Sequence, residues 1–228
     1  MLGEDKEVIS GYVLPKFDTS NMREYQAFFK EVNADGIKYR CMPTLESLEI
    51  ADSVRRTKAL AEIKESLDEI KDSVLNVRVG GNDFSNLFAI RRSVDQNVYQ
   101  MGVVASVLYD IINVFSRDYV VSGPVWEYFE TTDSDEWKIG LEKELALDKI
   151  NGFVGKTAIH PSQLPVIHRA LAVDKRDLED AMRILEWRSD ALAVEKSENS
   201  GRMNERKCHY AWAKKIAILA KIYGVKEE

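Results

Sequence analysis

The chain has 228 residues, enough for one hydrophobic core, and its 45% hydrophobic and 31% charged residues are typical of a globular protein. Its net charge of −6 argues against general nucleic-acid binding, and no apolar run approaches the roughly 18 residues that span a membrane. The first residues lack the apolar stretch of a signal peptide, and Cys41 and Cys208 form no Cys-x-x-Cys pair, so we expect reduced thiols in a cytoplasmic protein.

Short apolar segments alternate with longer amphipathic ones along the chain. Strand-forming sequence occurs near residues 11–15, 38–45, 75–79, 119–122 and 153–159. Helical spacing of apolar residues occurs near residues 21–32, 48–73, 98–115, 135–150, 175–194 and 203–223. This alternation predicts an α/β protein with a parallel sheet and right-handed crossovers.

Two acidic residues follow neighbouring strands of this predicted sheet. Glu46 comes directly after the second strand, and Asp83 follows the third, where Gly80 and Gly81 let a ligand approach the backbone. Parallel strands end at the same rim, so we expect the two carboxylates within about 6 Å of each other, as ligands of one Mg²⁺ ion would be. The alternative is that both residues only cap the helices that follow them.

Basic residues in and after the strands are candidates for binding an anionic substrate. Lys16 ends the first strand, where a lysine attracts carboxylate or phosphate, although a solvated lysine before a turn is the simpler interpretation. Arg40 and Arg78 lie inside strand segments, so each needs a rim carboxylate as partner or a substrate carboxylate held bidentately.

The most informative segment is Gly152-Phe-Val-Gly-Lys156-Thr-Ala-Ile-His160-Pro-Ser-Gln163. An apolar strand with glycines leads into a lysine, a His-Pro turn and a helix, which is typical of a βα unit at the active face of an α/β barrel. A P-loop is excluded, because Ile150 stands where that motif requires a glycine. We expect His160 to be mainly structural.

This segment closely resembles the last strand and loop of the citrate lyase beta-subunit / HpcH-HpaI aldolase superfamily, and three further segments are similar to it. These are Val13-Leu-Pro-Lys16, Met42-Pro-Thr-Leu-Glu46 and the stretch from Gly80 to Arg92. The nearest subgroup is the C–C bond lyases with a TIM-barrel fold. The resemblance implies that Glu46 and Asp83 bind Mg²⁺ and that Lys16 and Lys156 lie at the active face. We therefore assign Lys16, Arg78 and Lys156 to substrate binding.

The resemblance also sets the expected architecture. It implies an incomplete TIM (β/α)8 barrel of about five parallel strands with C-terminal helices, in which the family's first three strands have no counterpart. The chain is then either a fragment or an open sheet whose edge another chain covers. We expect a partial barrel over 1–194 and a lid or oligomerisation helix over 195–228. Asn82 departs from the family, most of whose members carry an acidic residue there.

The function implied by the resemblance is a Mg²⁺-dependent carbon–carbon bond lyase or aldolase. Its substrate would be a small hydroxy or oxo acid or the CoA thioester of one. The alternative is a truncated, non-catalytic homologue that acts as a partner-binding or structural subunit. Because an open sheet edge at 11–16 is a strong association surface, we also predict a homo-oligomer, with neither nucleic acid nor membrane as partner.

Overall fold

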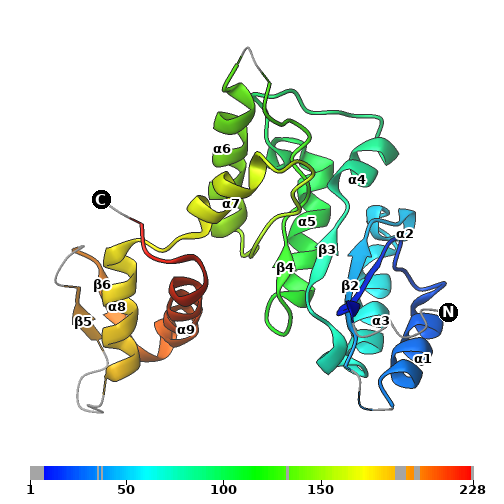
Figure 1. The fold of residues 1–228 in the computed structure, drawn as a ribbon, viewed down its shortest axis with the longest axis horizontal. Coiled ribbons are helices and arrows are strands. Elements are labelled where there is room, and N and C mark those ends of the chain that lie inside the picture. Colours follow the sequence, from blue (N-terminus) through cyan, green and yellow to red (C-terminus); the bar gives the residue numbers. More distant parts are fainter. Residues whose placement is uncertain are drawn as a thin grey trace. The chain divides into compact units, whose positions relative to one another are not determined.

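The computed structural model of the protein describes residues 8–34, 36, 38–131, 134–187, 194–197 and 201–226 (Figure 1). The chain forms two compact units, Met1–Leu164 and Pro165–Glu228. No helix in these residues is long and apolar enough to cross a membrane. Both cysteines are free, Cys41 being buried and Cys208 exposed.

The first unit is built on a parallel sheet of four strands in sequential order. The strands are β1 (Gly11–Leu14), β2 (Arg40–Leu45), β3 (Val77–Val79) and β4 (Val121–Ser122). The predicted fifth strand is reduced to a parallel bridge between Gly123 and Lys156, because Gly152 and Gly155 turn the backbone at φ values of 100° and 81°. The α/β class and the incomplete barrel of parallel strands are confirmed.

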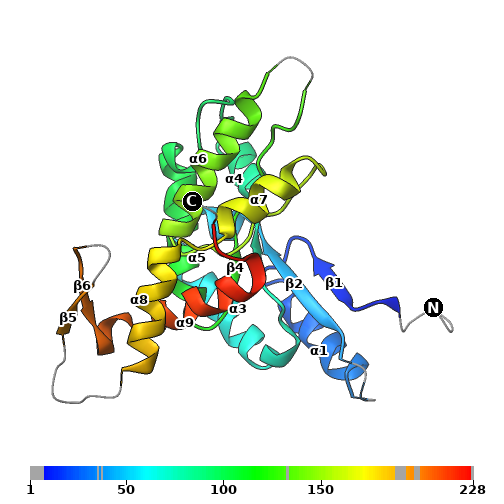
Figure 2. The same ribbon diagram turned by 60° about the vertical axis from the view of Figure 1, so that its left-hand side comes forward.

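Helices follow each strand of this unit (Figure 2). They are α1 (Met22–Val32), α2 (Leu48–Ala51), α3 (Arg56–Asp68), the 3-10 turn η2 (Lys71–Ser73), α4 (Gly81–Leu87), the 3-10 turn η3 (Val98–Gln100), α5 (Gly102–Phe115) and α6 (Glu136–Ile150). The single helix expected over 48–73 is divided, because the Asp52 side chain accepts a hydrogen bond from the Val54 amide and stabilises a turn.

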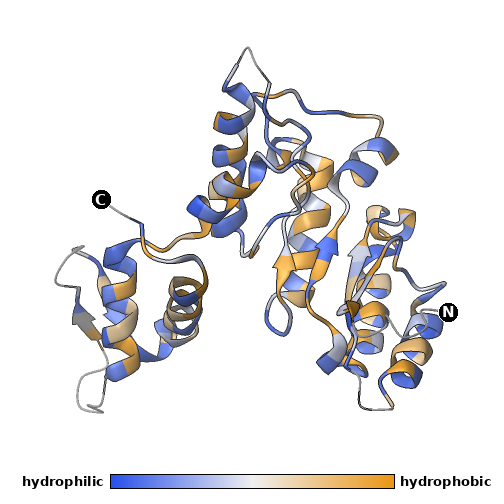
Figure 3. Cartoon of the chain, viewed as in Figure 1, coloured by the Kyte–Doolittle hydropathy of each residue, from blue (hydrophilic) through white to orange (hydrophobic). Residues whose placement is uncertain are grey.

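The two faces of the sheet have different side chains. Cys41, Leu45, Val77, Val79 and Val121 belong to the buried core, together with apolar residues of α3 and α5. In Figure 3, α5 is hydrophobic over most of its length, as a helix packed in a core should be. Side chains alternate along a strand, so Thr44, Arg78 and Ser122 lie on the opposite face, aligned by the strand register. We call these three residues the inner row.

The second unit contains two packed helices and a hairpin. After α7 (Gln163–Leu171), which begins at the end of the first unit, come α8 (Lys175–Glu186), the antiparallel strands β5 (Val194–Lys196) and β6 (Met203–Glu205), and α9 (Arg206–Tyr223). Buried Asp180 accepts hydrogen bonds from Ser197, Arg202 and Asn204, which ties the hairpin to α8. The end of the helix expected over 175–194 lies partly outside the described residues. The division at 194/195 and the lid role of 195–228 stay predictions.

Candidate metal and anion site

Glu46 and Asp83 converge at the carboxyl ends of β2 and β3. Glu46 follows β2 directly, and Asp83 lies in the first turn of α4. A methyl group on Gly80 would collide with Oε2 of Glu46 and would lie 3.1 Å from Oδ2 of Asp83, so both oxygens border one small space. The predicted convergence at one rim is therefore found, whereas the role of the two residues as metal ligands stays a prediction.

Lys16 supplies positive charge to this carboxylate pair. Its Nζ donates a hydrogen bond to Asp83 and lies 4.0 Å from Glu46 Oε1, and its backbone N–H donates to the same Glu46 oxygen at 2.8 Å. The backbone of Lys16 has a φ of 54°, in the left-handed region that non-glycine residues rarely adopt. Asn21 holds this turn by donating to the Lys16 carbonyl at 2.8 Å. Strained residues of this kind are frequent at functional sites.

The electrostatics of the pair fit a bound cation. Burial raises the pKa of Glu46, and the negative charge of Asp83 adds to this, against the opposing effect of the Lys16 N–H and ammonium. The hydrogen bond to Asp83 raises the pKa of Lys16. The ammonium of Lys16 therefore acts as a stand-in for a cation between two carboxylates. Among the described residues no cluster of three or more metal-binding side chains occurs.

Arg78 lies below this pair, on the inner face of the sheet. It is two residues before Gly80, and its Nη2 donates to Thr157 Oγ1 at 3.2 Å. None of the carboxylates described in the structure lies within ion-pair distance of its guanidinium. The sequence-based interpretation of Arg78 as a partner of a rim carboxylate is therefore not what the structure shows, and its binding of a substrate carboxylate stays a prediction.

Lys156 is placed differently from Lys16 and Arg78. Its side chain is fully buried, and Nζ lies 2.8 Å from both Glu144 Oε1 and Asp148 Oδ2 of α6. Burial opposes the charge of Lys156, but the two carboxylates outweigh it and raise its pKa. Because side chains alternate along an extended segment, Lys156 faces α6 and the next residue, Thr157, faces the inner row. A substrate contact of Lys156 stays a prediction, and the structure gives it two protein partners instead.

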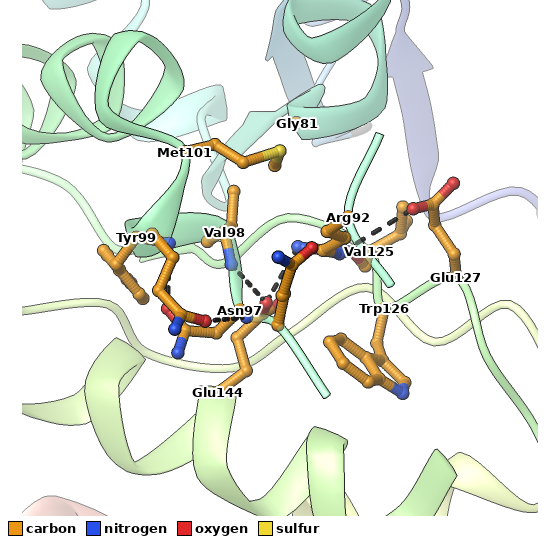
Figure 4. Close-up of polar contacts among 12 residues, drawn as sticks. Gly81, Arg92, Asn97, Val98, Tyr99, Met101, Val125, Trp126, Glu127 and Glu144 are labelled. Carbon is orange, nitrogen blue, oxygen red and sulfur yellow. Dashed lines mark hydrogen bonds and ion pairs between the residues drawn. The ribbon is translucent and has the colours of Figure 1, made fainter. Parts of the chain in front are cut away.

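Glu144 connects Lys156 to a second buried cation, Arg92. Figure 4 shows the side of Glu144 that contacts Arg92 and Val98. Its Oε2 accepts from Arg92 Nη1 and from the Val98 amide, each at 2.8 Å. The guanidinium of Arg92 also donates to the Val125 carbonyl and lies over the Trp126 ring, 4.9 Å from its centroid.

We call Arg92, Glu144, Asp148 and Lys156 the buried ion cluster. It joins the loops that follow α4 and β4 to the segment that carries Lys156. The spacing of Glu144 and Asp148, four residues apart on a predicted helix, was the available sequence signal for it.

The side chain of His160 contacts other residues of the protein and stabilises the turn that carries it. The imidazole stacks on Phe129 with 4.8 Å between ring centroids, and its Nδ1 lies 2.9 Å from Ser162 Oγ. Gln163, at the start of α7, donates to the carbonyls of Trp126 and Tyr128. These contacts hold the loop after β4 beside the end of the 152–163 segment.

Comparisons with known proteins identify relatives of this chain. The model of the family described as C-C bond lyase of the TIM-barrel fold matches residues 1–225. No curated protein matches.

Among solved structures, the chain is similar to a citrate lyase from Burkholderia xenovorans LB400, with 16% identity, a TM-score of 0.64 and coverage of 96% of this chain and 66% of that one. It is similar to CitE from Mycobacterium tuberculosis in complex with magnesium, acetoacetate and coenzyme A, with 19% identity, a TM-score of 0.60 and coverage of 93% and 68%. RipC from Yersinia pestis matches with 17% identity, a TM-score of 0.52 and coverage of 71% and 63%. The chain thus spans about two thirds of the length of these structures, and the similarity shows a shared fold.

Proposed function

The chain belongs to the family of C–C bond lyases with the TIM-barrel fold, and from this membership we propose that it is a Mg²⁺-dependent carbon–carbon bond lyase or aldolase. Its proposed substrate is a small hydroxy or oxo acid or the CoA thioester of one. The similar CitE from Mycobacterium tuberculosis forms a complex with magnesium, acetoacetate and coenzyme A, which supports this choice of metal and substrate class.

One observation carries the proposal. The carboxylates of Glu46 and Asp83 converge beside Gly80, which has no side chain to fill the space, and the Lys16 ammonium lies against them. Two facing carboxylates repel each other unless a cation lies between them. A side chain that is 60% exposed, as that of Lys16 is, can turn away when an ion or a substrate takes its place.

The residues of the chain have separate proposed tasks at this site. Glu46 and Asp83 would hold the metal, which when bound supplies Lewis-acid polarisation of an oxo or carboxylate oxygen. Lys16, at the open rim, would attract the negative charge of the substrate, and Arg78 would receive a carboxylate below it. Asn82, adjacent to Asp83, adds no further negative charge, so the pair itself carries the charge that neutralises Mg²⁺.

Calorimetric titration with MgCl₂ tests the metal site. We expect Asp83→Ala and Glu46→Gln each to weaken Mg²⁺ binding by at least about tenfold, because even residues outside the coordination shell contribute that much in metal sites. Glu24→Gln, which removes an exposed carboxylate from α1, is the matched control and should leave the affinity unchanged. An unaltered Mg²⁺ affinity in Asp83→Ala contradicts the proposal. Cleavage assays on small hydroxy and oxo acids and their CoA thioesters then test the reaction.

The second candidate is a non-catalytic homologue that works as a subunit of an assembly. In the described part of the chain β1 pairs only with β2, and Val13 of β1 and Phe28 of α1 are exposed beside it. A cavity of about 370 Å³ lies at this edge, lined by residues of β1 and α1. Unpaired strand edges associate readily, so we propose a homo-oligomer that covers β1 for either candidate function. Light scattering on dilute protein tests this, and a stable monomer contradicts it.

A further inference from the structure

A second carboxylate after β2 contacts the loop that carries Lys16. Glu49 lies in α2, three residues after Glu46, and both of its oxygens accept hydrogen bonds from Thr19. Oε1 accepts from the Thr19 backbone N–H at 2.8 Å, and Oε2 accepts from the Thr19 hydroxyl at 2.6 Å. No ion pair of the described residues includes Glu49, so Thr19 is the group that satisfies this half-buried carboxylate.

Glu46 and Glu49 hold the loop between β1 and α1 at matching positions. Glu46 accepts from the backbone N–H of Lys16, and Glu49 accepts from that of Thr19, so the two residues of each pair are 30 apart in the sequence. The side chain of Asn21, by comparison, donates and accepts within the loop itself. Glu49 is therefore the side chain that ties the outer half of this loop to α2.

The backbone of Lys16 depends on support of this kind. Its φ of 54° lies in the left-handed region, which is unfavourable for a residue with a Cβ atom and persists only where surrounding contacts fix it. Without a contact at Thr19, the loop can relax towards ordinary backbone angles. The direction of the Lys16 N–H follows from those angles, so the contact at Thr19 decides whether this N–H reaches Glu46.

The N–H of Lys16 determines which oxygen of Glu46 is available. It donates to Oε1, and Oε2 is the oxygen that borders the space beside Gly80 and Asp83. Without this bond the carboxylate can rotate, because the terminal torsion of a glutamate has a broad energy minimum. Residues that orient the ligands of a metal change its affinity by about 10- to 100-fold. A residue that holds this N–H in place therefore acts on the proposed metal site.

We propose that Glu49 is a positioning residue of the metal site. By binding Thr19 it holds the left-handed turn at Lys16. The N–H of this turn keeps Oε2 of Glu46 directed at the space shared with Asp83. Glu49 acts through its hydrogen bonds and not through its charge. This inference rests on the proposed metal-dependent function of Glu46 and Asp83.

Calorimetric titration with MgCl₂ in a Lys16→Met background tests this role. A loosened loop would also release the Lys16 ammonium from Asp83, and methionine removes that competing charge while it keeps the backbone N–H. We expect Glu49→Ala in this background to weaken Mg²⁺ binding by at least about tenfold, the lower end of the effect of an orienting residue. An unchanged affinity overturns the proposal.

Conservative variants in the same background separate position from charge. Glu49→Gln removes the charge, but its amide can accept from the Thr19 N–H and donate to the Thr19 hydroxyl oxygen, so the affinity should stay within about twofold. Thr19→Ser keeps both donors and should behave alike, whereas Thr19→Val loses the hydroxyl and should weaken Mg²⁺ binding by a smaller factor than Glu49→Ala. A loss in Glu49→Gln equal to that in Glu49→Ala would assign the effect to charge and overturn the proposal.

A further control excludes a general loss of stability. Tyr99→Phe removes a hydrogen bond to Asp148 in a different part of the unit and should leave the Mg²⁺ affinity unchanged. If it lowers the affinity as much as Glu49→Ala does, stability accounts for the effect and the positioning role is wrong. Thermal unfolding reports whether each variant is folded. If Glu49→Ala is not, the comparison of Thr19→Val with Thr19→Ser decides the question.

The outcomes separate the positioning role from the function on which it rests. If neither wild type nor Lys16→Met shows Mg²⁺ binding that Asp83→Ala weakens, the proposed metal site is wrong, and this inference falls with it. If Mg²⁺ binding depends on Glu46 and Asp83 but is the same with and without the Glu49 carboxylate, only the positioning role is wrong.

Discussion

Two lysines of this protein lie between two carboxylates, and they have opposite environments. Lys16 contacts Glu46 and Asp83 with its side chain 60% exposed, whereas Lys156 contacts Glu144 and Asp148 with its side chain fully buried. The carboxylates of the exposed site can exchange the lysine ammonium for another cation, since water solvates each ion once the contact is broken. The buried carboxylates cannot, because separating them from Lys156 leaves charges without water or partners. The same three residue types thus form an exposed site, which we propose binds a metal ion, in one place and part of the buried scaffold in another.

The largest expected effect is on stability, in the buried ion cluster. Lys156→Met removes the cation that Glu144 and Asp148 share, and we expect it to lower the free energy of unfolding by about 3–5 kcal/mol. The matched change at the exposed site, Lys16→Met, should alter it by less than about 1 kcal/mol. Urea unfolding curves measure both. Similar small losses in the two variants would remove the contrast between the two lysines.

A smaller effect is expected at the edge of the same cluster. The Tyr99 hydroxyl donates to Asp148 Oδ1 at 2.7 Å, and burial together with Asp148 raises the pKa of this tyrosine. Tyr99→Phe should therefore cost about 1–2 kcal/mol of unfolding free energy, from the loss of a hydrogen bond to a charged group. Tyr109 stacks on Tyr99 and is 46% exposed, so Tyr109→Phe is a control that should be close to neutral.

Substitution of Lys16 at the exposed site should change the affinity for Mg²⁺. If the Lys16 ammonium competes with Mg²⁺ for Asp83, Lys16→Met should tighten Mg²⁺ binding by about fivefold, the equivalent of one exposed charge interaction of about 1 kcal/mol. Calorimetric titration measures this change. Weaker Mg²⁺ binding in Lys16→Met would mean that the lysine supports the metal site instead of competing for it.

The smallest expected effect is the pH dependence of Mg²⁺ binding at the exposed site. The pKa of Glu46 lies above its ordinary value of 4.5, chiefly because of burial, so the folded protein favours the protonated form. The stability that this proton provides is present below the ordinary value and is lost as the pH rises through the raised pKa. Mg²⁺ requires the ionised carboxylate, so its affinity should increase over the same interval. Titrations at several pH values should show this increase in wild type, and a clearly smaller one in Glu46→Gln.

The sequence was sufficient for the general plan of the first unit. The alternation of apolar strands and amphipathic helices predicted parallel strands in sequential order, and Glu46 and Asp83 do converge at their carboxyl ends. Both predictions rest on local pattern and on a general property of parallel sheets, which is that successive strands end at the same rim. The sequence motifs also led to the family that the comparison with family models shows.

Only the tertiary structure decided which way neighbouring side chains face. Lys156 and Thr157 are adjacent, yet one is buried against α6 and the other contacts Arg78. A glycine-rich segment has no clear hydrophobic alternation, so its orientation depends on the elements packed against it, here Glu144 and Asp148 of α6. The left-handed turn at Lys16 depends likewise on Asn21 and Glu46, which lie outside the strand that carries the lysine. Side chains outside each segment determined both geometries, and of those at Lys16 only Asn21 is near in the sequence.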